Sequence, residues 1–246
     1  MKTKKLLLAA LFSALFLNLA NASSFPNRIS SLQNNTNAFF QSLNYLETSL
    51  KNDAPELEDW SLCYESDKIY IYERWVKNSI GNLIRERKGV MIVNSNVSNA
   101  VYHISNYDFQ KKWMKNVEST RLLKKKSDTC WITYTIFGLP WPLDNRDVVS
   151  EYHLKTAKSG NFAKININSL NNLVKESDGI SRIKNYNATW EIKKLNETKI
   201  AITFTASSDA QQIAPAVILD PIMRKTFQKN LLNLRNMLEV KILVKI

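Results

Sequence analysis

One long apolar stripe near the C-terminus constrains the fold more than any other feature. Between Pro215 and about Val240, apolar residues recur at alternating spacings of three and four positions. They are Leu219, Met223, Phe227, Leu231, Leu234 and Leu238. This spacing places them on one face of a helix of about five or six turns, longer than simple packing on a small sheet requires. The pattern therefore predicts a long C-terminal helix that a curved sheet wraps around.

The middle of the chain has the pattern of consecutive strands. We expect strands over 60–65, 68–75, 83–93, 130–137, 146–155, 162–170, 180–186, 189–194 and 199–206. We expect short helices over 97–105 and 108–116, and an amphipathic helix over 29–50. Strands that follow one another without long helices between them form an antiparallel sheet. The predicted fold class is therefore α+β, with a curved antiparallel β-sheet around a long C-terminal α-helix.

The first 22 residues have the organisation of a secretory signal peptide. A basic start precedes an almost unbroken apolar run over 6–19 and then Ala20-Asn21-Ala22, a small-x-small cleavage pattern. The apolar run is shorter than the roughly 20 residues that cross a bilayer. We therefore expect a signal peptide over 1–22 and a single domain over 23–246. The mature protein is expected to be exported, periplasmic or secreted, and soluble, with an uncleaved membrane anchor as the alternative.

Positive charge is concentrated in one segment of a chain whose net charge is +12. The segment 111–126 contains seven lysine and arginine residues and one glutamate. A basic surface suits nucleic acid, an anionic membrane or an acidic partner. Export and the lack of a nucleic-acid-binding motif argue against nucleic acid. We expect Lys124, Lys125 and Lys126 to dock on an anionic membrane surface, and a solvated basic face is the alternative.

Few residues suggest catalysis. His103 and His153 are the two histidines, and no nucleophile, zinc or phosphate-binding motif occurs. Cys63 and Cys130 lack metal-ligand spacing, and the sequence leaves their pairing open because it does not set the distance between them. We therefore expect no catalytic residue, no cofactor and no metal.

Five segments occur in an order typical of one known family. They are Trp60 with the strand 68–74, then 108–113, 140–149, 188–192 and 209–220. The most specific is 140–149, which reads Pro-Trp-Pro-Leu-Asp-Asn-Arg-Asp-Val-Val. Together they resemble the START family, the StAR-related lipid transfer domains. One departure is the last turn, where the family's usual glycine is absent near Gln212 or Ile213.

The resemblance implies a helix-grip fold and a carrier that binds and transfers one lipid or other apolar molecule in an internal cavity. A carrier needs no reaction, because burial of apolar surface contributes roughly 25 cal/mol per Å². We expect a monomer whose ligand-binding residues include Tyr152, Met223, Phe227 and Leu231, with Trp141 near the mouth of the cavity. Each of these side chains could equally belong to a filled core.

Arg146 and Asp147 are expected to be structural. Neighbouring residues on a strand point to opposite faces, so the two side chains cannot both face a cavity. We expect Arg146 to pair with an acidic group or to cap carbonyl groups where the strand begins.

Two other function classes remain open, because a fold does not by itself determine a function. A helix-grip enzyme of cyclase or hydrolase type would need one of the two histidines near the cavity. An adaptor that binds a protein through its basic face would need no cavity at all. The volume of an internal pocket distinguishes these hypotheses.

Overall fold

The computed structural model describes residues 60–66, 69–78, 81, 83–139, 144–208 and 216–239, with 216–219 as backbone only. All of them belong to one unit, Glu58–Ile246. The expected signal peptide, the helix expected over 29–50 and Trp141 lie outside the described residues. No helix in the described part of the chain is long and apolar enough to span a membrane.

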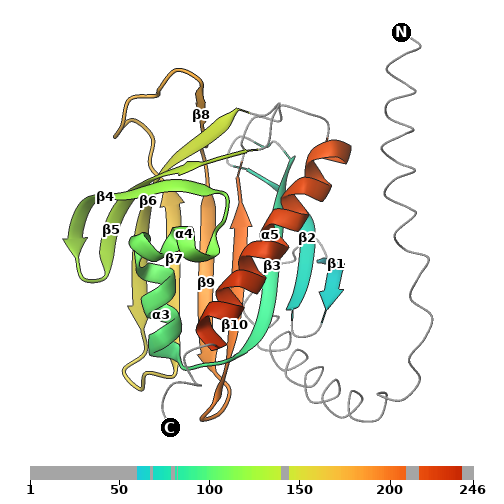
Figure 1. Cartoon of the computed structure of the whole chain (residues 1–246), viewed down its shortest axis with the longest axis vertical. Helices are drawn as coiled ribbons and strands as arrows, with labels where there is room; N and C mark the ends of the chain where they lie inside the picture. Colours follow the sequence, from blue (N-terminus) through green and yellow to red (C-terminus); the bar gives the residue numbers. More distant parts are fainter. Residues whose placement is uncertain are drawn as a thin grey trace. The chain divides into compact units, whose positions relative to one another are not determined.

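The described strands form a ten-stranded sheet in the order β1-β2-β3-β10-β9-β7-β6-β5-β4, with β8 added beside β6 (Figure 1). All pairs along this path are antiparallel, whereas β8 runs parallel to the start of β6. The strands are β1 Ser61–Ser66, β2 Ile69–Lys77, β3 Leu83–Asn94, β4 Val117–Ser127, β5 Cys130–Phe137, β6 Asn145–Thr156, β7 Phe162–Ser169, β8 Ile180–Arg182, β9 Asn187–Lys194 and β10 Lys199–Ser207.

The helices pack on one face of this sheet, which we call the inner face, and the opposite face is the outer face (Figure 1). They are α3 Val97–Ser105, the 3-10 helix η1 Tyr107–Phe109, α4 Gln110–Trp113 and α5 Ala216–Glu239. The side chain of Asn96 caps α3 by accepting a hydrogen bond from the backbone N–H of Asn99 at 2.8 Å. The curved antiparallel sheet with its long C-terminal helix confirms the predicted α+β helix-grip fold.

Two expected elements differ from the observed ones, and one strand was not expected. The helix expected over 108–116 is a 3-10 turn followed by the short α4. The strand expected over 180–186 ends at Arg182, and Asn185 beyond it has a φ of 51°, a left-handed conformation outside a strand. The edge strand β4 was not predicted, because irregularities in its pairing and a run of lysines break its alternation.

Among the side chains of α5 that the structure describes, the apolar stripe is buried against the sheet along the C-terminal half of the helix. Leu231, Leu234 and Leu238 are buried, and Phe227 is half-buried against the core. Met223 is 43% exposed, so its expected place in the interior was wrong. At this level the helix presents Arg224 to the sheet instead, because its partner Glu73 is buried there.

A glycine on β3 allows α5 to approach the sheet closely. A Cβ atom at Gly89 would collide with Cδ1 of Leu231 and would lie 2.9 Å from Cε1 of Phe227. Only a residue without a side chain permits this approach of helix to strand.

Candidate functional site

The candidate site is a pocket in the interior of the unit, between the inner face of the sheet and α3 and α4. Side chains on alternate positions of a strand share a face, so Thr135 and Phe137 of β5 point into it together with Val148, Ser150 and Tyr152 of β6. The remaining lining residues are Ile104, Gln110, Trp113, Met114, Ile167, Tyr186, Trp190 and Phe204.

Aromatic rings form one wall of the pocket. The ring of Trp113 meets that of Trp190 edge to face at 5.9 Å, and Trp190 stacks on Phe204 at 4.0 Å. Phe204 in turn stacks on Phe227 of α5 at 5.3 Å. These rings connect α4 through the sheet to α5. Large rings in such contact bury apolar area in a defined geometry, which makes this wall apolar and rigid.

A chain of hydrogen-bonded polar groups also reaches the lining of the pocket. Gln110 donates from Nε2 to the Tyr152 hydroxyl at 3.2 Å and accepts at Oε1 from Thr120 at 3.1 Å. The hydroxyls of Thr120 and Thr135 lie 3.2 Å apart. Burial raises the pKa of the Tyr152 hydroxyl above its usual value, so this group is neutral at physiological pH. The pocket thus combines an apolar wall with uncharged polar groups.

One lining residue has an unsatisfied hydrogen-bond donor. The indole N–H of Trp113 is buried and has no hydrogen-bond partner among the described residues. A buried donor without a partner costs about 1–3 kcal/mol. An acceptor atom on a bound molecule would remove that cost.

The pocket is small in this conformation. Its volume is about 30 Å³, enough for about one or two water molecules, whereas pockets for drug-sized ligands measure roughly 300–1,000 Å³. A larger ligand therefore requires that lining side chains or helices move apart.

The structure places the expected ligand-binding residues in three different environments. Tyr152 lines the pocket and stacks on Trp131 at 5.2 Å. Phe227 and Leu231 face the sheet beneath α5 but do not line the pocket. Met223 is exposed on α5.

Sequence reasoning did not single out Gln110, Trp113 or Trp190. All three occur inside segments that carry the START resemblance, 108–113 and 188–192. Their position within these motifs was a signal that could have identified them.

Arg146 and Asp147 lie on opposite faces of β6, as expected of neighbours on a strand. Asp147 is fully buried on the outer face and accepts from Arg182 at 2.6 and 3.0 Å and from the Tyr134 hydroxyl at 2.8 Å. Arg146 is buried on the side of the pocket. Asp147 thus ties β6 to Arg182 at the end of β8, and the expected acidic partner or carbonyl cap of Arg146 stays a prediction.

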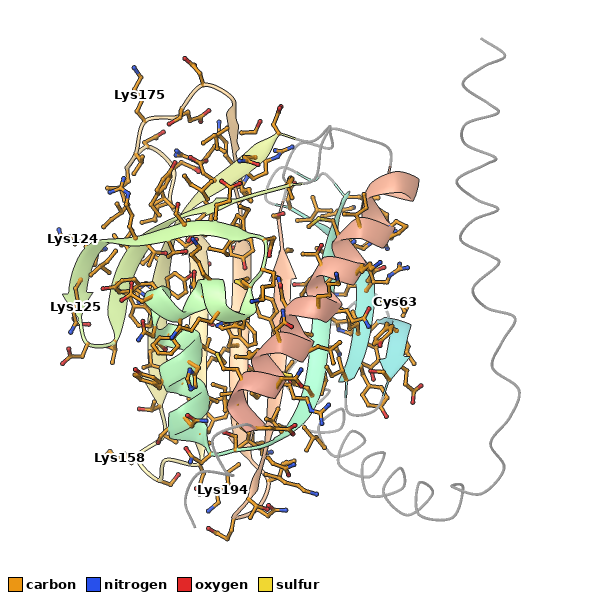
Figure 2. The ribbon with its side chains drawn as sticks, viewed as in Figure 1. Cys63, Lys124, Lys125, Lys158, Lys175 and Lys194 are labelled. Carbon is orange, nitrogen blue, oxygen red and sulfur yellow. The ribbon has the colours of Figure 1, made fainter. Side chains whose placement is uncertain are left out.

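The expected membrane-docking lysines lie at the edge strand β4. Lys124 and Lys125 project from this edge of the sheet (Figure 2), and both are exposed. Lys125 pairs with Asp128 at 2.6 Å, and Lys126 pairs with Glu151 at 2.5 Å. The hydrogen bond from Lys126 lowers the pKa of Glu151 below its usual value.

Neither histidine lines the pocket. His103 is buried among Tyr102 and Phe109, with ring centroids 5.2 Å from each. His153 lies on the outer face, next to Glu151. Both cysteines are free thiols, Cys63 on the edge strand β1 and Cys130 on β5 near the opposite edge of the sheet.

The chain resembles several known proteins. No family model matches it. It is 23% identical to an uncharacterized protein of Pseudomonas aeruginosa over 153 residues, which are 62% of this chain and 73% of that protein.

Solved structures with the same architecture include lipid transfer proteins and a cyclase. A STAR-related lipid transfer protein fragment of Xanthomonas axonopodis has a TM-score of 0.65 and 23% identity, covering 74% of this chain and 99% of that fragment. Human StAR-related lipid transfer protein 5 has a TM-score of 0.65 and 18% identity, covering 82% and 97%. The Zhui aromatase/cyclase of Streptomyces sp. R1128 has a TM-score of 0.51 and 10% identity, covering 65% and 97%. The chain therefore has the START-like helix-grip fold.

Proposed function

We propose that this protein binds a single lipid or other apolar molecule in its interior pocket and carries it without chemical change. The observation that carries the proposal is the composition of the pocket, which is lined by aromatic rings together with a few neutral polar groups. An apolar body would displace water from the rings, and each Å² removed from water contributes about 25 cal/mol. The lipid transfer proteins that share the fold support the proposal of lipid binding.

The polar groups favour a ligand with one uncharged or weakly polar end. The buried indole N–H of Trp113 offers a donor to an oxygen of the ligand. The Tyr152 hydroxyl and the Gln110 amide are hydrogen-bonded to each other, which fixes their positions. Both groups are uncharged, and they could orient a polar group of the ligand. A hydroxyl or carbonyl group on an otherwise apolar molecule fits this arrangement.

The first experiment measures uptake of a fluorescent sterol and a fluorescent fatty acid by the purified full chain. We expect saturable binding of one probe per chain. Native mass spectrometry of the gently purified protein should also reveal a co-purified lipid. Saturation of neither probe, together with a bare protein mass, would contradict the proposal.

A matched pair of substitutions tests the role of the indole donor. Trp113→Phe keeps an aromatic side chain but removes the indole N–H and part of the ring, so we expect the affinity for a probe with an acceptor oxygen to fall about two- to tenfold. Trp75→Phe is the control, because Trp75 lies on β2 under Arg85 and does not line the pocket. Equal losses in both variants would exclude a specific role for Trp113.

The proposal includes binding without catalysis. No histidine lines the pocket, so the general base that a cyclase or hydrolase most often uses is not near the ligand. We expect a bound lipid to be recovered with its mass unchanged after prolonged incubation. A product of altered mass would favour the enzyme hypothesis.

We also propose that the basic edge at β4 docks on anionic membranes. Each lysine near such a surface contributes about 1 kcal/mol. Reversal of Lys124 and Lys125 to Glu should therefore reduce binding to phosphatidylserine vesicles by at least about tenfold and leave neutral vesicles unaffected. Reversal of Lys158 and Lys175, which are exposed elsewhere (Figure 2), is a control with the same change in net charge. Equal losses would show that only the total charge matters.

Export is the remaining part of the proposal. Cleavage after Ala22 would leave Ser23 as the first residue of the mature chain. N-terminal sequencing of the protein from an extracytoplasmic fraction should give Ser23, and an intact Met1 or Lys2 end would contradict export.

A further inference from the structure

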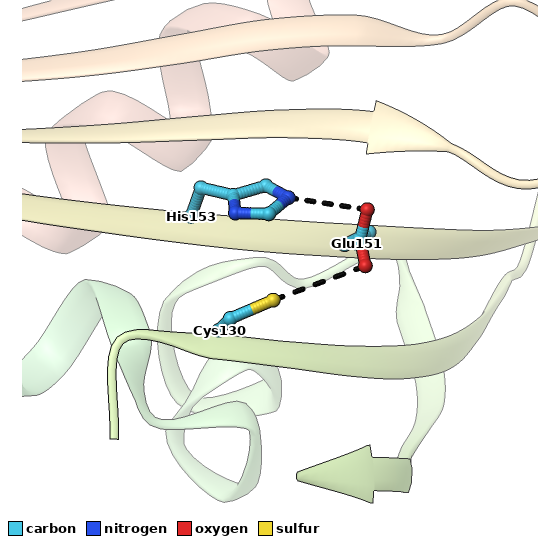
Figure 3. A group of neighbouring side chains, drawn as sticks. All are labelled: Cys130, Glu151 and His153. Carbon is cyan, nitrogen blue, oxygen red and sulfur yellow. Dashed lines mark hydrogen bonds and ion pairs between the residues drawn. The ribbon is translucent and has the colours of Figure 1, made fainter. Parts of the chain in front are cut away.

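Three potential metal ligands meet on the outer face of the sheet, away from the pocket. Cys130 of β5 is paired directly with His153 of β6, and Glu151 lies two residues before His153 on the same face. One ligand atom from each residue lies within 4.8 Å of the other two (Figure 3). Nε2 of His153 is 3.1 Å from one oxygen of Glu151, and Sγ of Cys130 is 3.8 Å from the other.

We propose that Cys130, Glu151 and His153 form a binding site for a divalent transition metal of borderline softness, with Zn²⁺ as the best fit. Thiolate, imidazole and carboxylate are the protein ligands that Zn²⁺ takes, and hard cations such as Mg²⁺ and Ca²⁺ select oxygen ligands alone. Three protein ligands leave one position open for water or another molecule.

The geometry is close to what a tetrahedral site requires. With Zn–S of about 2.3 Å and Zn–N of about 2.0 Å, ligand atoms around Zn²⁺ lie about 3.5 Å apart. Small rotations of the three partly exposed side chains would close the difference from the present separations. We expect the strand backbones to stay in place, because β5 and β6 are each hydrogen-bonded to a neighbouring strand on both sides.

The surroundings leave the metal accessible. The side chain of His153 is 45% exposed. Asn166 and Asn168 of β7 lie opposite His153 and Glu151, and both line a polar hollow of about 200 Å³ on the outer face. The hollow therefore lies beside the proposed site, on the side of β7.

Lys126 of β4 is the charged side chain that competes for the site. Its Nζ lies 2.5 Å from Oε1 of Glu151, the oxygen nearer Cys130, while Oε2 faces His153. The carboxylate can therefore offer Oε2 to the metal while Oε1 keeps Lys126. The ammonium group repels a cation, so its removal is expected to tighten metal binding.

The sequence did not reveal this site. Glu151 and His153 lie two residues apart on one face of a single strand, but Cys130 comes close only through the pairing of β5 with β6. Tyr152, between the two ligands, points into the pocket on the inner face. The metal site is thus independent of the proposed lipid binding, and either can fail without the other.

Cobalt titration of the untagged full chain tests the proposal. Co²⁺ substitutes for Zn²⁺ and is coloured, and a thiolate ligand adds a charge-transfer band in the near ultraviolet. We expect this band to saturate at one Co²⁺ per chain and to disappear when Zn²⁺ is added. No such band would overturn the proposal.

Substitutions assign the band to its ligands. Cys130→Ser should abolish it, whereas Cys63→Ser should retain it, because Cys63 lies on a strand at the far edge of the sheet. His153→Gln should weaken affinity for Co²⁺ more than about tenfold, the lower range for loss of even an outer partner of a metal. Lys126→Met should strengthen it. Circular dichroism checks that each variant is folded. A band that survives in folded Cys130→Ser, or an unchanged affinity in His153→Gln, would overturn the assignment.

Discussion

At the C-terminal end of α5, Leu231, Leu234 and Leu238 are 2%, 0% and 0% exposed, whereas at its N-terminal end Asp220 and Arg224 make the contact with the sheet. One helix is therefore attached to one sheet in two ways. Apolar burial responds little to salt or to protonation of carboxylates, whereas ion pairs depend on both.

The polar end is a network of five charged side chains. Glu73 of β2 accepts from Arg87 at 2.8 Å and from Arg224 at 2.7 Å. Asp220 accepts from Arg87 at 2.8 Å and from Arg85 at 3.1 Å. Each carboxylate thus receives two arginines. The network fixes Asp220 and Arg224 of α5 against the sheet by charge, whereas Leu231, Leu234 and Leu238 attach the helix by apolar burial.

The largest effect is expected at the apolar end. Leu234→Ala removes a fully buried side chain, so we expect the free energy of unfolding to fall by about 2–5 kcal/mol. Met223→Ala is the matched control on the same helix and should change stability by less than about 0.5 kcal/mol, because Met223 is exposed. Urea denaturation measures both. Equal losses of stability in Leu234→Ala and Met223→Ala would mean that both ends of α5 depend on apolar burial to the same extent.

Gly89 tests the closest approach of helix to sheet. Gly89→Val places methyl groups where Leu231 and Phe227 now lie, and overpacking of this kind costs about 1–3 kcal/mol. When Leu231→Ala is combined with Gly89→Val, the methyl groups of valine can occupy the space that the leucine side chain leaves. The double variant should therefore lose less stability than the sum of the two single variants. Strict additivity in denaturation experiments would show that α5 does not touch Gly89.

The polar end should respond to Glu73→Gln. Two arginines lose a charged partner, and we expect about 1–3 kcal/mol of destabilisation at pH 7. Glu191→Gln is the control, since Glu191 pairs with the more exposed Lys164 and should cost less than about 1 kcal/mol. A larger loss in the control would contradict the importance of burial.

Acid should remove the contribution of Glu73. Burial by itself would raise the pKa of Glu73, but the hydrogen bond from Arg224 and the charge of Arg87 outweigh it and lower the pKa. A carboxyl group with a lowered folded-state pKa stabilises the protein fully above its unfolded pKa of about 4.3, and this contribution is lost as pH falls through the folded value. The stability gap between wild type and Glu73→Gln should therefore be constant from pH 7 to about pH 5 and shrink below about pH 4.3. A gap that does not shrink in acid would contradict the ion-pair interpretation.

The smallest effect is expected for Asp220→Asn. Its ion pairs with Arg85 and Arg87 are partly exposed, so we expect about 0.5–1 kcal/mol at low salt. At about 1 M salt the Debye length is about 3 Å and the difference should nearly vanish. Denaturation in the two salt concentrations measures it, and a difference that persists at high salt would point to packing rather than charge.

Local patterns were sufficient for the elements with clean periodicity. The helix α3 begins and ends where it was expected, because Val97, Val101 and Ile104 share one face and Asn96 caps its start. Strand β5 likewise has the expected bounds. For β4, irregular pairing and exposed lysines removed the alternation on which a strand prediction depends.

Only part of the candidate site followed from the sequence. Tyr152 was expected in the interior and lies there, since its neighbours on β6 alternate between the faces. Gln110 was not expected, because a polar residue beside lysines on a short helix is normally exposed. It is buried here because its amide has partners on β4 and β6, two strands that follow it in the sequence.

The sequence by itself determined which residues share a face: the stripe of α5, the alternation along β6, and with them the α+β helix-grip architecture. Only the tertiary structure decided what each face meets. The N-terminal half of α5 contacts Glu73 and Arg87 through Arg224 and Asp220, and Met223 is exposed. The pairing of β5 with β6 brings Cys130 beside His153. Periodicity is a property of neighbours along the chain, whereas a contact depends on a partner from a distant segment, and that partner exists only once the sheet has formed.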